Sequence, residues 1–203
     1  MSTIIDLVGS IIFGGALLLI VINANEMASE NQSVYNGDML VQEMLVQTAH
    51  LVEGEFRNMG VGIPEGTRTI LAADTSDVTF LYDADRNGVV DTVRYVAGLR
   101  SEMTSSPNAL DRPLYRRLNH ESLQTVGVVT VFRLKYLRRS GEEIAPPVAL
   151  ADLSEIFSIE ITMEVQNPFT VLRSAGTQAG QREELYSSSL WQQTRLASQN
   201  FRR

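Results

Sequence analysis

The first 56 residues contain no lysine or arginine, and this feature restricts the fold more than any other. Within them, residues 7–22 form a run of 16 residues without a charged side chain, which corresponds to about 24 Å of helix. Counted from Ser2, the apolar stretch measures roughly 31 Å, enough to span the hydrocarbon core of a bilayer. The segment therefore predicts a helix whose surroundings are apolar.

Three interpretations of this segment are open. A secretory signal peptide needs a basic n-region, whereas this chain offers Asp6 and no base, although residues 22–24 (Ile-Asn-Ala) would pass as a cleavage site. A buried helix of a soluble core is the second interpretation. The third, which we favour, is a retained single-span anchor, in which Ser10 and Gly14 offer a small-residue face for helix–helix contact.

The charge imbalance of the chain lies entirely in this first quarter. The chain has 24 acidic and 17 basic residues, for a net charge of −7, and residues 57–203 carry 17 of each. The acids of the first quarter are Asp6, Glu26, Glu30, Asp38, Glu43, Glu53 and Glu55. A neutral remainder argues against a nucleic-acid-binding protein, and no nucleic-acid partner is predicted. The absence of cysteine excludes a disulfide framework and a thiol nucleophile.

The helical pattern continues beyond Ile22 but becomes one-sided. Apolar residues recur at spacings of 7, 4, 7, 4 and 3, which is typical of a single stripe along an α-helix. This stripe consists of Val34, Val41, Leu45, Val52, Phe56 and Met59. The glycines at 60 and 62, followed by Pro64, predict the end of the helix. We expect one helix of about 55 residues. Its apolar N-terminal half must be buried by something outside this chain.

From Thr67 on, the hydrophobic period changes to two residues, which predicts β-strands. The candidate strands are residues 78–83, 92–96, 113–118, 128–137 and 157–165, while residues 174–181 predict a loop. The expected fold class is α+β: a long N-terminal helix, apolar and then amphipathic, packed on an antiparallel β-sheet. We divide the chain into a hydrophobic membrane or filament-core helix (1–25), its amphipathic continuation (26–62) and a globular sheet domain (63–203).

One loop between two predicted strands has a metal-binding pattern. Oxygen-bearing residues alternate through it, and Gly88 stands at the sixth position, as a tight turn around a hard cation requires. The expected Ca²⁺ ligands are Asp83, Asp85, Asn87 and Asp91 through side chains and Val89 through its carbonyl. The twelfth position holds Arg94 instead of a bidentate Glu, so we expect a calcium loop within a hairpin. The alternative is a polar hairpin turn without an ion.

Other residues give weaker signals. The basic residues Arg133, Lys135, Arg138 and Arg139 could bind phosphate, but a solvated strand edge explains them better. His50 and His120 stand in no catalytic motif, and the sequence has no glycine-rich phosphate loop and no nucleophile elbow. We therefore do not expect an enzyme.

The order of apolar stretch, amphipathic continuation and antiparallel sheet resembles the type IV pilin superfamily, which includes the type II secretion pseudopilins. Residues 2–6 (Ser-Thr-Ile-Ile-Asp) are similar to the mature pilin start, Phe-Thr-Leu-Ile-Glu, and without Met1 the Asp6 carboxylate takes the fifth position. Residues 56–60, 78–83 and 87–95 resemble the minor pilins of the W and J types. The chain departs from the family in two ways: it shows no basic leader ending in Gly, and it has Asp where the family has Glu.

The resemblance implies a structural subunit that assembles with copies of itself or with other pilin-like subunits into a helical filament. It also implies a single-pass protein of the inner membrane before assembly and an extracytoplasmic or cell-surface filament afterwards. Asp6 would then pair with the N-terminal ammonium of a neighbouring subunit. The alternative function is a stand-alone, single-span membrane-anchored module that binds calcium and an extracytoplasmic partner.

Overall fold

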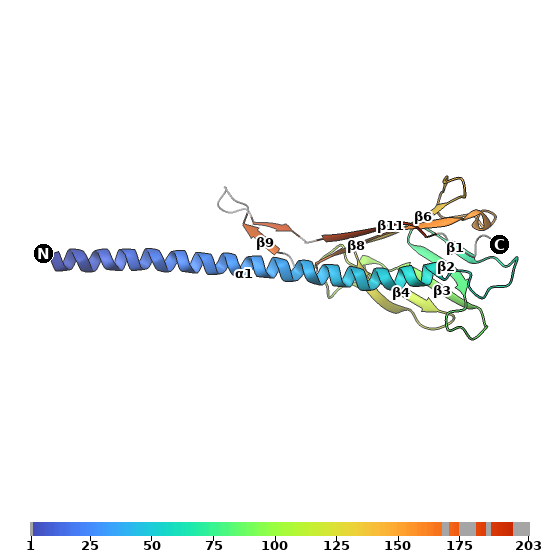
Figure 1. Cartoon of the computed structure of the whole chain (residues 1–203), viewed down its shortest axis with the longest axis horizontal. Coiled ribbons are helices and arrows are strands. Elements are labelled where there is room, and N and C mark those ends of the chain that lie inside the picture. Colours follow the sequence, from blue (N-terminus) through green and yellow to red (C-terminus); the bar gives the residue numbers. More distant parts are fainter. Residues whose placement is uncertain (1, 168–170, 175–181, 186–187, 197–203) are drawn as a thin grey trace.

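The computed structural model describes residues 2–167, 171–174, 182–185 and 188–196, with side chains from residue 3 to residue 167. One helix, α1 (Ser2–Arg57), runs for 56 residues without a break, and its N-terminal half projects beyond the sheets (Figure 1). The turn after α1 contains Gly60 and Gly62 at φ +80° and +77°, a conformation that glycine adopts without strain. The long helix and its end are therefore confirmed.

Eleven strands and two short 3₁₀ helices follow α1 in the described part of the chain. A five-stranded antiparallel sheet has the order β1 (Ile70–Ala73), β2 (Asp77–Tyr82), β3 (Asp91–Ala97), β4 (Arg112–Leu118) and β5 (Gln124–Val129). A four-stranded sheet has the order β11 (Ser188–Leu196), β8 (Ser158–Gln166), β6 (Val131–Leu137) and β7 (Glu143–Ile144). The strands β9 (Val171–Ser174) and β10 (Arg182–Leu185) form a separate hairpin; the 3₁₀ helices are η1 (Arg100–Glu102) and η2 (Leu153–Glu155).

The predicted strands correspond to β2, β3, β4, β5 with β6, and β8, and the α+β fold class is confirmed. The candidate strand 128–137 is in fact two strands, because the chain passes from one sheet to the other at Thr130, whose amide bonds to the carbonyl of Glu164 in β8. The strands β1, β7, β9, β10 and β11 were not predicted. Of the predicted loop 174–181, Ser174 ends β9 and the remainder lies outside the described residues.

The core lies between the second half of α1 and the two sheets. Of the predicted stripe, Val34 is partly buried and the other five residues are buried. Phe56 sits at the centre, with its ring 5.2 Å from Phe80 of β2 and 5.6 Å from Tyr95 of β3, measured between centroids. The four-stranded sheet contributes alternate residues of β8, including Ile159, Ile161, Met163 and Val165. The amphipathic half of α1 is thus the central element of the head, as we call the part of the chain formed by this half of the helix and the sheets.

The backbones of α1 and β5 approach each other closely at one point. A Cβ atom on Gly127 would lie 2.5 Å from Oγ1 and 2.9 Å from Cγ2 of Thr48, so no larger residue fits there without movement of the helix. This contact, together with the pairing of Leu114 and Gly127 across β4 and β5, fixes the level of the sheet along the helix.

Candidate assembly helix and cation-binding loop

The apolar segment of α1 makes no contact that buries it within the described chain. Its large apolar residues, from Ile4 to Ile22, have exposed fractions between 43% and 75%. Among the described residues, α1 is the one helix whose length and composition would allow it to cross a membrane, and none of its most apolar window is buried. This surface needs a lipid or protein environment, because exposed apolar area costs about 25 cal/mol per Å² in water.

Asp6 lies inside this apolar segment and is exposed. Its backbone carbonyl accepts a hydrogen bond from Ser10 Oγ at 2.7 Å, which is a local contact within the helix. The carboxylate forms no ion pair with any described residue, and the first base along the helix is Arg57, at its opposite end. Asp6, the predicted assembly residue, therefore has no cationic partner among the described residues of its own chain.

The predicted calcium loop joins β2 to β3, and its carboxylates are hydrogen-bonded to the loop backbone. Asp83 accepts from the amides of Asn87 (3.1 Å, Oδ1) and Gly88 (2.9 Å, Oδ2). Asp85 accepts from the Asn87 amide (3.1 Å) and its side-chain Nδ2 (2.7 Å). Gly88 has φ +85°, so this turn requires a glycine. The loop is therefore an ordered turn built around carboxylates.

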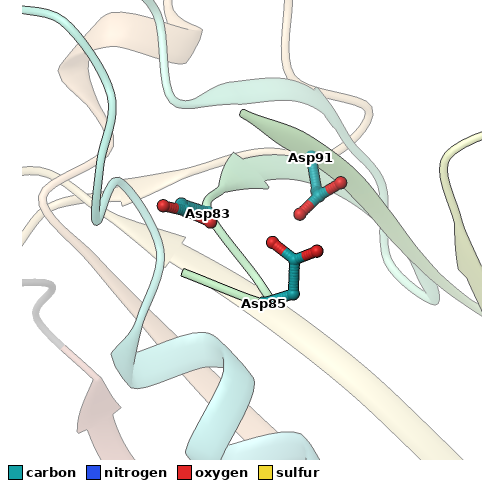
Figure 2. A group of neighbouring side chains, drawn as sticks. All are labelled: Asp83, Asp85 and Asp91. Carbon is teal, nitrogen blue, oxygen red and sulfur yellow. The ribbon is translucent and has the colours of Figure 1, made fainter. Parts of the chain in front are cut away.

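Three carboxylates of this loop converge. One oxygen from each of Asp83, Asp85 and Asp91 lies within 4.8 Å of the others, and Figure 2 shows Asp85 and Asp91 directed toward each other with Asp83 beside them. Two oxygens that both lie 2.3–2.6 Å from one Ca²⁺ ion are at most about 5 Å apart. Their spacing therefore fits a shared cation. The hydrogen bonds from the backbone also offset part of the repulsion among the three charges.

The other two predicted ligands are placed differently. The side-chain oxygen of Asn87 accepts the amide of Val89 at 2.7 Å, so it is engaged within the loop. Val89 is 64% exposed, and its predicted ligand atom is the backbone carbonyl, so this exposure does not test the prediction. Three of the five predicted ligands are thus brought together by their side chains.

Asn119, in the turn between β4 and β5, is a loop partner that the sequence did not reveal. Its Nδ2 donates to Asp91 Oδ1 at 2.7 Å, and its Oδ1 accepts the amide of Thr92 at 2.8 Å. The second oxygen of Asp91 accepts the amide of Ala84 at 2.9 Å. Asp91, only 8% exposed, is therefore held on both sides. Asn119 lies 28 residues from Asp91, so only the fold shows this contact.

The loop between β2 and β3 also rests against the end of α1. The amide of Gly60 donates to Leu81 at 2.9 Å, and the amide of Asp83 donates to Val61 at 2.9 Å. A Cβ on Gly62 would lie 2.7 Å from Cβ of Asp83, so the two backbones are in close contact. The position of Asp83 is therefore tied to the turn that ends the helix.

A largely buried ion pair joins α1 to the five-stranded sheet. Arg116 of β4 donates from Nε to both oxygens of Glu55 at 2.9 Å, and its side chain is 17% exposed against 13% for Glu55. The Tyr95 hydroxyl donates to the same carboxylate at 2.5 Å. Burial, and then the charge of Glu55, raise the pKa of Tyr95 far above its ordinary value. No sequence pattern indicated this cluster, because Tyr95 and Arg116 lie 40 and 61 residues from Glu55.

The weaker candidates have ordinary structural roles or none that the described contacts show. His50 and His120 are exposed. Arg138 forms ion pairs with Glu142, Asp152 and Glu155, so it holds η2 against the end of β6. The Arg139 guanidinium lies over the Phe157 ring, 5.1 Å from its centroid.

No protein-family model matches the sequence, and no curated protein matches it. A solved structure with some likeness is a type IV-like pilin from Thermus thermophilus. The two chains are 13% identical, with a TM-score of 0.42 over 79% of this chain and 96% of that chain. Values this low carry no argument about function, so the proposals below rest on the residues and geometry of this chain.

Proposed function

We propose that this chain is a structural subunit of a type IV pilus-like or type II pseudopilus-like filament. The observation that carries the proposal is the apolar segment from Ile4 to Ile22, which is exposed throughout and projects from the head (Figure 1). In a filament, the same segments of neighbouring copies bury one another. The similarity of residues 2–6 to the mature pilin start supports this role. The subunit would reside in the inner membrane before assembly and in an extracytoplasmic or cell-surface filament afterwards.

Asp6 favours a filament over a solitary anchor. A carboxylate in a low-dielectric bundle must be neutralised or paired, and residues 1–56 contain no Lys or Arg. The α-amino group is then the one positive charge of the segment. If the mature chain begins at Ser2, as the resemblance implies, a parallel copy displaced by four residues, or about 6 Å, would bring its N-terminal ammonium level with Asp6. Partners of this kind are other copies of the chain or other pilin-like subunits.

The experiment compares Asp6→Ala with Asp6→Glu. We expect Asp6→Ala to block assembly, because it leaves the ammonium of the neighbour unpaired in the filament core. Asp6→Glu keeps the charge and should assemble like the wild type. Negative-stain microscopy and quantification of sheared surface fractions measure filaments, while the abundance of the chain in the membrane serves as the control. If Asp6→Ala assembles at wild-type levels, the filament mechanism fails and the stand-alone membrane-anchored module becomes the better function.

We also propose that the loop between β2 and β3 binds one Ca²⁺ ion and thereby stabilises the head. Its support is the convergence of Asp83, Asp85 and Asp91 within a distance that one ion can bridge. Asn119 holds Asp91 from a second hairpin, so an ion would also connect the β2–β3 loop with the β4–β5 turn. The role of calcium in this proposal is structural, and we assign no catalytic residue.

A further inference from the structure

A basic and apolar rim lies on the side of the head that faces the N-terminal half of α1. Arg100 of η1 is exposed, and Arg112 begins β4 beside it. Leu99 and Leu110, in the same connections, are 69% and 39% exposed. We call these four residues the rim.

The level of the rim along α1 follows from strand register. Arg116 of β4 contacts Glu55 of α1. Leu114, two residues earlier in β4, pairs with Gly127, which lies against Thr48 of α1. The start of β4 is therefore nearer to the N-terminal half of α1 than its end is. Arg112 pairs with Val129, two residues beyond Gly127. Two strand residues cover about 6.6 Å, which is roughly four helix residues. The rim therefore lies close to the level of Met44.

The two arginines of the rim have no carboxylate partner among the described residues. Neither forms an ion pair there, and the buried Nε of Arg112 has no hydrogen-bond acceptor in the same part of the chain. Burial, followed by the charge of Arg100, lowers the pKa of Arg112. Two guanidinium groups close together, beside exposed leucines, fit an apolar surface that carries carboxylates.

We propose that the rim binds the helix of a second copy of this chain around Glu26, an interface that rests on the proposed filament. Glu26 is exposed on the part of α1 that its own head leaves free, and Met27 beside it is 64% exposed. A parallel copy displaced toward the head by 18 residues, or about 27 Å, brings its Glu26 to the level of Met44. The rim thereby acquires the carboxylate it lacks within its own chain.

Charge complementarity is the reason for choosing this occupant. The part of α1 that precedes Met44 carries acids and no base. A parallel neighbouring copy therefore presents the rim with a neutral or acidic surface at any displacement along the helix. Residues 57–203 have 17 bases for 17 acids, so all the basic side chains of the assembly lie at or beyond the C-terminal end of α1.

Disulfide cross-linking tests the contact while it leaves the charges intact. The chain has no cysteine, so Ser29→Cys, one turn from Glu26, and Ser101→Cys, beside Arg100, introduce the only thiols. Within one chain these sites are about 22 Å apart along the helix, far beyond the reach of a disulfide, so any bond is intermolecular. Cells that express both single variants with different tags should give mixed dimers in sheared filaments under mild oxidation. The control pair replaces Ser101 with Ser140, an exposed residue past the far end of β6, and should give at least tenfold less.

Charge reversal provides the second measurement. Arg100→Glu, at an exposed site, should lower the yield of sheared filaments at least tenfold, and Glu26→Arg should do the same. The combination of Arg100→Glu with Glu26→Arg should restore the yield to within threefold of the wild type. Suppose that the wild type forms filaments but the cross-link is no stronger than the control, or the double variant shows no rescue. Either result overturns the rim interface and leaves the filament proposal standing. A wild-type chain that forms no filament overturns both.

Discussion

At the residue scale, the three carboxylates between β2 and β3 lead to a direct test. If one Ca²⁺ ion bridges Asp83, Asp85 and Asp91, it should raise the free energy of unfolding by about 2.7 kcal/mol at a hundredfold excess over Kd. Thermal unfolding of the full chain in detergent, with calcium and then with EGTA, measures this gain. We expect Asp83→Ala and Asp85→Ala to abolish the difference between the two conditions.

The difference between the two conditions matters more than the stability of each variant, because Asp83 also accepts hydrogen bonds from Asn87 and Gly88. Asp77→Ala, which breaks the ion pair with Arg94 outside the loop, is the matched control and should keep the calcium-dependent gain. A wild-type melting temperature that does not respond to EGTA would count decisively against the ion.

The second residue-scale prediction concerns the attachment of α1 to the sheet. Glu55→Gln removes the charge that Arg116 and Tyr95 both contact, in a cluster whose paired side chains are only 13% and 17% exposed. We expect a loss of about 2–4 kcal/mol in the free energy of unfolding, because a buried guanidinium is left unpaired. Glu53→Gln breaks the exposed pair with Arg57 two residues away and should cost less than about 1 kcal/mol. Urea unfolding of both variants measures the contrast, and equal losses would show that the buried pair is not special.

Residue spacing in the sequence predicted local groups and missed distant ones. Asp83, Asp85 and Asp91 lie within nine residues, so their alternation through a turn was visible before the fold was known. Asn119 and the Glu55–Arg116 pair join segments 28 and 61 residues apart, and only strand register brings them together. The carboxylates of the loop were thus predictable from the sequence, whereas Asn119, which holds Asp91 from another turn, was not.

At the scale of elements, the close approach of α1 and β5 leads to a coupled prediction. Gly127→Ala would place a Cβ 2.5 Å from Thr48 Oγ1, so the helix or the strand must move. We expect a loss of about 1–3 kcal/mol in the free energy of unfolding. Thr48→Ala removes the two nearest atoms, so the double variant should recover most of that loss. Urea unfolding of the four proteins of this cycle gives the coupling energy, and strictly additive losses would contradict the contact.

Periodicity predicted the elements that have one buried and one exposed face. The stripe from Val41 to Met59 and the alternation in β6 and β8 both correspond to burial in the fold. The edge strands β1 and β7 contain only four and two residues, too short for a period to be recognised. The C-terminal strand β11 has a largely polar sequence, and its pairing with β8, which makes it a strand, cannot be read from the sequence.

At the scale of the whole molecule, the chain consists of a head with its own core and an apolar segment without one. Every buried apolar residue of the described side chains lies at or after Val41, while the segment from Ile4 to Ile22 is exposed. In the proposed filament, assembly and folding would therefore depend on different residues. The rim and Asp6 would act between copies, whereas Glu55, Phe56 and the loop between β2 and β3 lie within the head.

This division makes the outcome of a truncation predictable. Deletion of residues 1–25 removes the exposed apolar surface and leaves every buried apolar residue of the described core in place, so the product should be a soluble, folded monomer. A deletion that continues to residue 45 also removes Val41 and Leu45 from the core, and each lost large side chain should cost about 2–5 kcal/mol. Analytical ultracentrifugation and circular dichroism distinguish the two products. The shorter deletion should give one species at monomer mass with a cooperative melting transition, and the longer one should melt at a clearly lower temperature or fail to fold. If the product that lacks residues 1–25 aggregates or lacks a transition, the head depends on the apolar segment, and the separation of folding from assembly is wrong.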